Sequence, residues 1–260
     1  MKPLLKGVGG RALLSPTVAL CLVMLLMLCP ATAQNDSLPL VGYWPFEEPQ
    51  GTAVLDASNR DHAGEIMNDS RGVKRAPGRT GNALEFSGGE AGQRNQAGAL
   101  ALKGMEQVDW SQGLTVELWV KLNKFDRPAT YELVSNTVGD RGPGFRFVIS
   151  WQSLALRSGE GGAGATWGAA SQPSATALKV GEWMHVAATY DGSVFRVYVD
   201  GALAGESAPD LKLTPGEGRI SVGSYRGGYA YGLDGLVDEL KLYNVARSPA
   251  AIMADARLGR

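Results

Sequence analysis

The chain has 260 residues, with 25 lysine and arginine residues against 26 aspartate and glutamate residues and a formal net charge of −1. This balance gives no electrostatic reason to expect nucleic acid or an anionic membrane as a partner. The length is sufficient for one large core, because all-β sandwiches commonly occupy about 200–250 residues as a single domain.

Residues 1–33 have the pattern of a secretory signal peptide. Three basic residues precede an apolar run of 13 residues at 17–29, and Ala-Thr-Ala at 31–33 fits the small-x-small rule for cleavage. A membrane helix needs about 20 apolar residues, so the pattern predicts export with no membrane span after cleavage. We therefore expect the protein to be secreted, periplasmic or held at the cell surface.

Cleavage after residue 33 would change the composition of the mature chain. Both cysteines lie in the removed segment, so the fold cannot depend on disulfides. Three of the 25 basic residues and none of the 26 acidic residues are lost with it, which leaves a net charge of −4. Residues 34–39 are then a polar linker, and 40–260 form one domain.

From residue 40 to about residue 245, short β-prone runs alternate with turn signals, such as the Asp-Gly pairs at 191–192 and 200–201. The predicted strands are 41–46, 53–55, 63–67, 83–87, 98–102, 114–121, 131–135, 144–151, 154–157, 166–170, 175–179, 183–190, 194–200, 202–206, 219–223 and 235–243. Only the C-terminal residues are predicted to form a helix, with Ser248 as its N-cap and Pro249 at its first position. The predicted fold class is all-β, an antiparallel two-sheet jelly-roll sandwich with a short C-terminal helix.

Six segments, in order along nearly all of the chain from residue 40, carry a resemblance to a known family. They are VGYWPFEEPQGTAVLDAS at 41–58, GNALEFSGG at 81–89, GLTVELWVKL at 113–122, GEWMHVAATYDG at 181–192, VYVDGALAGE at 197–206 and GLVDELKLYNVARS at 235–248. These segments resemble the laminin-G-like jelly-roll domains of the concanavalin A-like lectin/glucanase superfamily. The resemblance leaves the function open, because this architecture carries lectins, adhesion modules and glycosidases alike.

The glucanases that share this architecture make hydrolysis the first catalytic question. A retaining glycosidase needs two carboxyl groups about 5–5.5 Å apart, and related glucanases supply them from an E-x-D-x-x-E strand that this chain lacks. Asp238 and Glu239 are adjacent, so we expect them on opposite faces of their strand. Glu117 has no acidic partner at 115 or 119. His185 is interpreted as a hydrogen-bonded strand histidine, and we predict no catalytic residues.

The resemblance also implies a structural calcium ion. Related jelly rolls often bind Ca²⁺ where the first strand, the loop after it and the last strand meet, and calcium requires six to eight oxygen ligands. The matching residues are Glu47, Asp56, Asn59, Asp61 and Asp238.

Calcium is expected to raise the melting temperature (Tm) by several degrees, because a ligand that binds only the folded state stabilises it. Magnesium should not replace it, and Asp238→Ala should remove the response. Arg60 and His62 depart from the small or neutral residues of the related loops. The alternative is that Asp56 and Asn59 build turns and Asp238 binds backbone at a strand edge. A melting curve that neither calcium nor a chelator changes would rule out the ion.

Aromatic residues next to glycine-rich segments form a candidate ligand face. Exposed aromatic rings stack on the apolar faces of sugars, while neighbouring polar groups fix the orientation. The alternative is that these rings are core residues. The predicted ligand-binding residues are Tyr225, Arg226, Tyr229, Tyr231, Trp151 and Trp167.

The sequence therefore predicts a secreted, non-enzymatic recognition module that binds a glycan or a cell-surface or matrix protein. Two alternatives stay open. One is a glycoside hydrolase whose acid pair is noncontiguous, such as Glu117 with another residue of its strand face. The other is a structural surface protein without a ligand.

Overall fold

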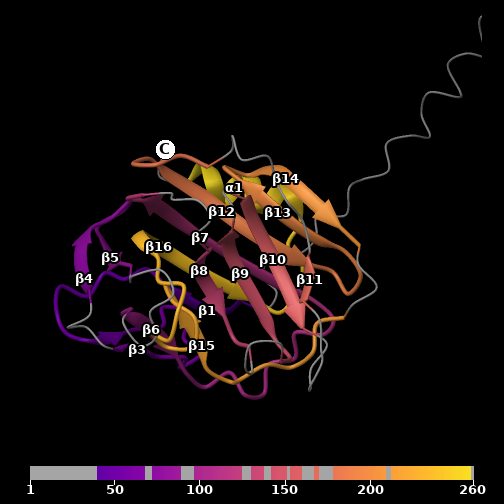
Figure 1. The fold of residues 1–260 in the computed structure, drawn as a ribbon, viewed down its shortest axis with the longest axis horizontal. Coiled ribbons are helices and arrows are strands. Elements are labelled where there is room, and N and C mark those ends of the chain that lie inside the picture. The colour runs from indigo at the N-terminus through magenta and orange to yellow at the C-terminus, as the bar shows by residue number, and fades with distance from the viewer. Residues whose placement is uncertain are drawn as a thin grey trace, which may run out of the picture. The chain divides into compact units, whose positions relative to one another are not determined.

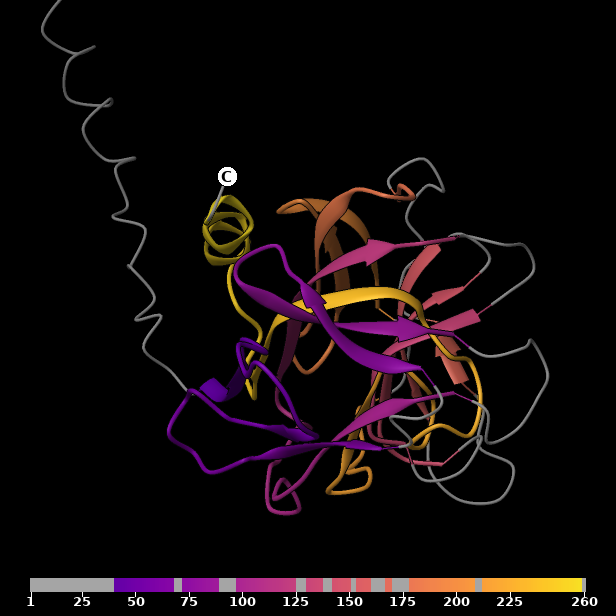
Figure 2. The same cartoon turned by 90° about the vertical axis from the view of Figure 1, so that its left-hand side faces the viewer.

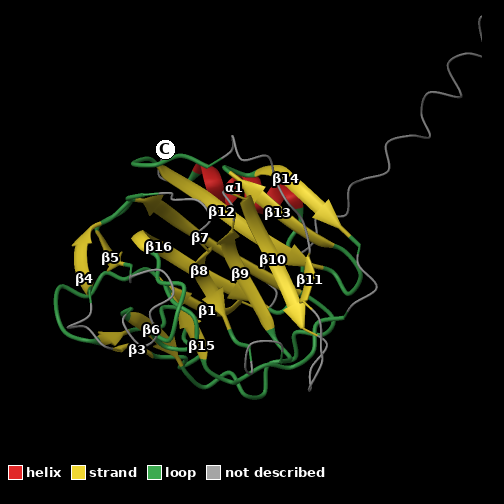
Figure 3. Cartoon of the chain, in the orientation of Figure 1, coloured by secondary structure: helices red, strands yellow, loops and turns green. Residues whose placement is uncertain are grey.

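A computed structural model of the chain shows two antiparallel sheets packed face to face and one helix (Figures 1 and 3). It describes residues 40–67, 72–88, 97–124, 130–137, 142–150, 153–159, 167–169, 178–208 and 212–258. The predicted all-β sandwich with a short C-terminal helix is confirmed. The predicted signal peptide and linker lie outside the described residues and stay predictions.

The first sheet, sheet A, contains the central strand β7 and the last strand β16. In spatial order it consists of β14 (Ala202–Ser207), β13 (Phe195–Val199), β12 (Trp183–Tyr190), β7 (Leu114–Leu122), β16 (Asp234–Tyr243), β5 (Asn82–Ser87) and β4 (Val73–Pro77), with β1 (Leu40–Trp44) also paired to β16. Strands distant in sequence thus become neighbours, since β7 pairs with both β12 and β16.

The second sheet, sheet B, faces it across the core. In spatial order it consists of β11 (Trp167–Ala169), β10 (Ser153–Gly159), β9 (Phe145–Ser150), β8 (Thr130–Ser135), β15 (Ile220–Val222), β6 (Ala99–Leu102), β3 (Gly64–Met67) and β2 (Ala53–Val54). Strand β15 fits between β6 and β8, which places the chain after β15 beside β8 and β9.

Side chains from the inner faces of both sheets form one continuous core. The inward-facing residues of β7 are Leu114, Val116, Leu118 and Val120, as their alternation predicts. Large aromatic side chains fill the space between the sheets, and the fully buried ones include Trp44, Phe46, Phe86, Phe145, Phe147 and Phe195. Burying each of these rings stabilises the fold by about 1.5–3 kcal/mol relative to exposure.

One described strand was not predicted, and one predicted run is not a strand where it is described. Strand β4 has the sequence Val-Lys-Arg-Ala-Pro, and its two charges and its proline are not typical of a β-strand, so the sequence pattern did not predict it. Within the described part of the chain it is an edge strand that pairs only with β5, and charged residues and proline are tolerated at sheet edges. The predicted strand 175–179 lies mostly outside the described residues, and residues 178–179 have no strand conformation.

The predicted helix is confirmed as α1 (Pro249–Arg257). The Ser248 side chain accepts a hydrogen bond from the Ala251 N–H at 3.2 Å, which satisfies one of the free amides at the helix start. Ile252 of α1 packs with Ala187 and Tyr198, so the helix lies on the outer face of sheet A (Figure 2). No helix in the described part of the chain is long and apolar enough to cross a membrane.

Candidate functional site

The three predicted tyrosines lie on one loop, residues 223–233, which we call the tyrosine loop. It runs from β15 to β16 and is fastened to β8 by backbone hydrogen bonds. The Glu132 N–H donates to the Tyr231 carbonyl at 2.8 Å, and the Gly223 N–H donates to the Leu133 carbonyl at 3.0 Å. A third bond, from the Leu233 N–H to the Gly223 carbonyl, closes the loop at 2.7 Å. The loop is therefore held in place by the strand that it crosses.

The backbone of the tyrosine loop is unusual. Arg226 and Tyr231 have φ angles of 50° and 56°, in the left-handed region that residues with a side chain rarely adopt. Gly223 has a φ of 76°, and a Cβ atom there would lie 2.2 Å from the Phe86 ring. Such conformations persist only where the surroundings fix them, and they are concentrated at binding sites.

The tyrosine rings form a compact group. Tyr225 is buried, Tyr229 is half-buried and Tyr231 is 47% exposed. The ring centroids of Tyr225 and Tyr229 are 6.3 Å apart, and those of Tyr225 and Tyr231 are 5.9 Å apart. The group thus combines a buried anchor with one ring face that is open to solvent, which answers in part whether these rings belong to the core.

A buried ion pair lies beneath the rings. Arg146 stands between Phe145 and Phe147 of β9, which point into the core, so its side chain is on the outer face of sheet B. Its Nε donates to Glu132 Oε1 at 3.0 Å, and its Nη2 donates to Glu132 Oε2. The Arg146 guanidinium also stacks under Tyr225 and Tyr231, 4.5 and 4.9 Å from their ring centroids. Such cation–π contacts hold the rings over the ion pair.

The remaining predicted ligand residues are placed only in part. Arg226 belongs to the tyrosine loop, but its Nη2 lies 3.9 Å from Glu217 Oε1. Trp167 belongs to β11, while its side chain and the whole of Trp151 lie outside the described residues. The structure therefore brings together the tyrosines and leaves the tryptophans untested.

The carboxylates proposed for calcium bind backbone amides. Asp56 Oδ1 accepts from the Tyr43 and Ser58 N–H groups at 3.0 and 2.8 Å, and Oδ2 accepts from the His62 N–H at 3.1 Å. Although burial favours the neutral acid, these hydrogen bonds lower the pKa of Asp56. Asn59 and Asp61 in the same loop have left-handed φ angles of 61° and 63°.

Asp238 and Glu47 both bind the turn at 78–82. Asp238 is fully buried, and its Oδ2 accepts from the Arg79 and Thr80 N–H groups at 2.8 and 3.1 Å. Glu47 Oε2 accepts from the Asn82 N–H at 3.1 Å. The described residues contain no group of three or more histidine, cysteine, aspartate or glutamate side chains that could hold a metal ion. The partners seen here are those of the turn-and-edge alternative, and calcium binding stays a prediction.

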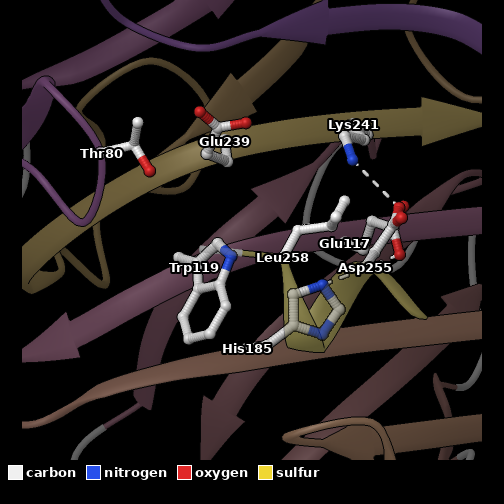
Figure 4. Close-up of a pocket in the computed structure, with 8 residues that line it drawn as sticks. All are labelled: Thr80, Glu117, Trp119, His185, Glu239, Lys241, Asp255 and Leu258. Carbon is white, nitrogen blue, oxygen red and sulfur yellow. Dashed lines mark hydrogen bonds and ion pairs between the residues drawn. The ribbon is translucent and has the colours of Figure 1, made fainter. Parts of the chain in front are cut away.

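A second polar cluster lies on the outer face of sheet A, around a cavity of about 100 Å³ (Figure 4). The cavity is lined by Thr80, Glu117, Trp119, His185, Glu239, Lys241, Asp255 and Leu258. Glu117 is buried, and its Oε1 lies 2.5 Å from Arg247 Nη1, which also contacts Asp255 Oδ2 at 2.6 Å. Lys241 Nζ contacts the same Asp255 oxygen at 3.0 Å. These contacts join α1 to β7 and β16.

The pKa values of the two buried acids in this cluster, Glu117 and Asp255, shift in opposite directions. Burial and the neighbouring Asp255 carboxylate raise the pKa of Glu117 to about 8, although Arg247 opposes the rise. Burial also favours the neutral form of Asp255, but its hydrogen bond with Glu117 and the charge of Lys241 lower its pKa. At neutral pH, Glu117 therefore holds the proton and Asp255 carries the charge.

The expectation that Asp238 and Glu239 face opposite sides of β16 is wrong. The pairing of β16 with β7 shifts between Asp238 and Lys241, and Glu239 has a φ of 54°. Asp238 is the partner of Trp119, and both Trp119 and Glu239 line the cavity on the outer face. A bulge inserts one extra residue into a strand, so the alternation on which the expectation relied fails there.

A family model described as "Concanavalin A-like lectin/glucanases superfamily", of the laminin-G type, matches residues 94–253. The chain belongs to this superfamily. The resemblance seen in the sequence is thereby confirmed. No curated protein matches the chain in sequence.

Solved structures share the superfamily fold at low identity. Domain 4 of AbnA, a GH43 extracellular arabinanase from Geobacillus stearothermophilus in complex with arabinotriose, has a TM-score of 0.63 and 20% identity, covering 84% of this chain and 98% of that domain. The binding domain of botulinum neurotoxin DC in complex with SialylT has a TM-score of 0.63 and 11% identity, covering 85% of this chain and 52% of that one. The chain thus spans about half the length of that toxin domain.

Sequence reasoning missed Glu132 and Arg146 on this lectin-like scaffold. Each is a single charge between apolar residues, a pattern typical of a residue on the solvent face of a strand. One signal could have found them: opposite charges occur in the consecutive predicted strands 131–135 and 144–151, which would face each other if the two strands formed a hairpin. Strands β8 and β9 do pair in this way.

Proposed function

We propose that this protein is a secreted, non-enzymatic module that binds glycans and that the tyrosine loop over sheet B is its binding surface. The observation that carries the proposal is Tyr231, which is half exposed above the buried Arg146–Glu132 pair. Aromatic rings held rigidly at a surface lose little conformational entropy on binding and stack on the apolar faces of sugar rings. Export of the protein rests on the pattern of residues 1–33.

The superfamily relatives support sugar as the ligand class. The arabinanase domain was solved with arabinotriose, and the neurotoxin binding domain with SialylT. An extracellular protein is the other partner that the sequence predicts. A glycan attached to such a protein would be a ligand of both predicted classes.

Tyr231→Ala is expected to weaken binding of a glycan found by array screening at least about thirtyfold, the effect of removing an aromatic hot-spot residue. The measurement is isothermal titration calorimetry. Leu203→Ala is the matched control, because Leu203 is similarly exposed, at 52%, but lies on β14 of sheet A. Equal affinities for Tyr231→Ala and the wild type would place the binding surface elsewhere. A protein that binds no glycan on the array would contradict the proposed function itself.

One observation favours the alternative that the protein is a glycoside hydrolase. Glu117 is a buried acid that stays protonated at neutral pH, as a general acid must, and it shares a cavity with Glu239. Its contacts with Arg247 and Asp255 instead fit a structural role. Turnover of β-glucans that Glu117→Gln abolishes would favour the hydrolase, because a binding module gives no turnover.

A further inference from the structure

A second arginine lies beside the buried ion pair on the outer face of sheet B. Arg157 of β10 is the direct cross-strand partner of Arg146 of β9. Leu154 and Leu156 of the same strand are in the core, so the alternation of side chains along β10 points Arg157 outward. Its side chain is half-buried. Two guanidinium groups are therefore adjacent next to the tyrosine loop.

The charges of the described residues at this place do not balance. Glu132 neutralises Arg146 through a bidentate ion pair. In the described part of the chain, no hydrogen bond or ion pair joins Arg157 to an acidic group. Burial and the neighbouring Arg146 lower the pKa of Arg157, while Glu132 and Tyr231 oppose this. Among the described residues, Glu132 is thus the single carboxylate that acts on both arginines, and one positive charge of this described set is left over. A partly buried charge without a counter-ion is unfavourable, and an anion would relieve it.

We propose that this face binds an acidic sugar, with Arg157 donating to an oxyanion of the sugar and Tyr231 stacking on the ring. The inference rests on the proposed glycan-binding function and names the ligand class. A guanidinium forms paired hydrogen bonds to a carboxylate or to a sulfate ester, so both are sources of the oxyanion. The predicted mature protein has a net charge of −4, so preference for an acidic ligand would come from this local charge rather than from the whole surface.

The test is affinity electrophoresis of the full chain in gels that contain one polymer each. Polygalacturonate and its carboxyl-reduced neutral form differ only in the carboxylate, and dextran sulfate and dextran differ only in the sulfate. We expect the protein to bind at least one acidic polymer about tenfold or more tightly than its neutral counterpart, as a charged hydrogen bond allows. The acidic polymer that gives this preference identifies the source of the oxyanion.

Arg157→Gln should remove the preference for the acidic polymer. Arg157→Lys should keep part of it, because lysine retains the positive charge but lacks the planar guanidinium that donates paired hydrogen bonds. Arg196→Gln is the control, since it deletes the same charge on β13 of sheet A, where Arg196 pairs with Asp191 and Glu206. Unchanged thermal melting of Arg157→Gln would show that the variant is folded. Equal retention by acidic and neutral polymers, or a preference that survives Arg157→Gln, would overturn the inference. Neutral glycan binding that Tyr231→Ala abolishes would leave the proposed function standing in that case.

Discussion

Glu132→Ala is expected to lower the free energy of unfolding by about 3–5 kcal/mol, the effect of breaking a buried ion pair. The variant leaves the Arg146 guanidinium buried beneath Tyr225 and Tyr231 without the carboxylate that it contacts through Nε and Nη2. For a domain of this size the Tm should fall by roughly 10 °C. Urea denaturation followed by tryptophan fluorescence measures the loss.

The matched control is Glu65→Ala, which deletes a carboxylate from the same sheet. Glu65 pairs with Lys103 at 2.7 Å, but their side chains are 51% and 59% exposed. An exposed pair contributes less than about 1 kcal/mol because water solvates both charges. The double variant Glu132→Leu/Arg146→Met should recover most of the stability, since removing both charges leaves neither unpaired. Similar losses for Glu65→Ala and Glu132→Ala would show that the ion pair of β8 and β9 is solvated in the folded protein.

Glu117→Gln is expected to make the protein more stable than the wild type at pH 8 and to flatten the dependence of stability on pH. In the folded state Glu117 keeps its proton up to a pKa of about 8, whereas the unfolded chain releases it near 4.5. Between these values the unfolded state binds fewer protons, so the stability of the wild type falls as the pH rises from about 5 to 8. One such group changes the free energy of unfolding by about 1.4 kcal/mol per pH unit.

Glutamine keeps a donor for Asp255 and an acceptor for Arg247, so the variant should stay folded and lose only the titration. Denaturation curves between pH 5 and 8 measure the slope. Burial also raises the pKa of Asp238, to about 7, so part of the fall should remain in the variant. Glu85→Gln serves as control, because Glu85 pairs at the surface with Lys74 and should leave the slope unchanged. Identical slopes for the wild type and Glu117→Gln would mean that Glu117 is ionised at neutral pH.

The order and boundaries of most strands follow from local sequence alone. A strand with one face in the core alternates apolar and polar residues, as β7 does from Leu114 to Val120, and Asp-Gly turns separate β12 from β13 and β13 from β14. The start of α1 was likewise readable from Ser248 and Pro249. Strand β4 could not be predicted because an edge strand needs no alternation of apolar residues. The bulge at Glu239 could not be predicted because it depends on the pairing of β16 with β7.

The sequence by itself also determined that the three tyrosines lie near one another, since Tyr225 and Tyr231, the first and the last, are only six positions apart. Tertiary structure alone decided what they cover. Glu132, Arg146 and Arg157 come from three strands, and pairing of β8 with β9 and of β9 with β10 brings them together beneath the tyrosine loop. The register of those strands decides which charge is buried and which one lacks a counter-ion among the described residues. A shift of one residue would reverse the faces, so no local pattern contains that information.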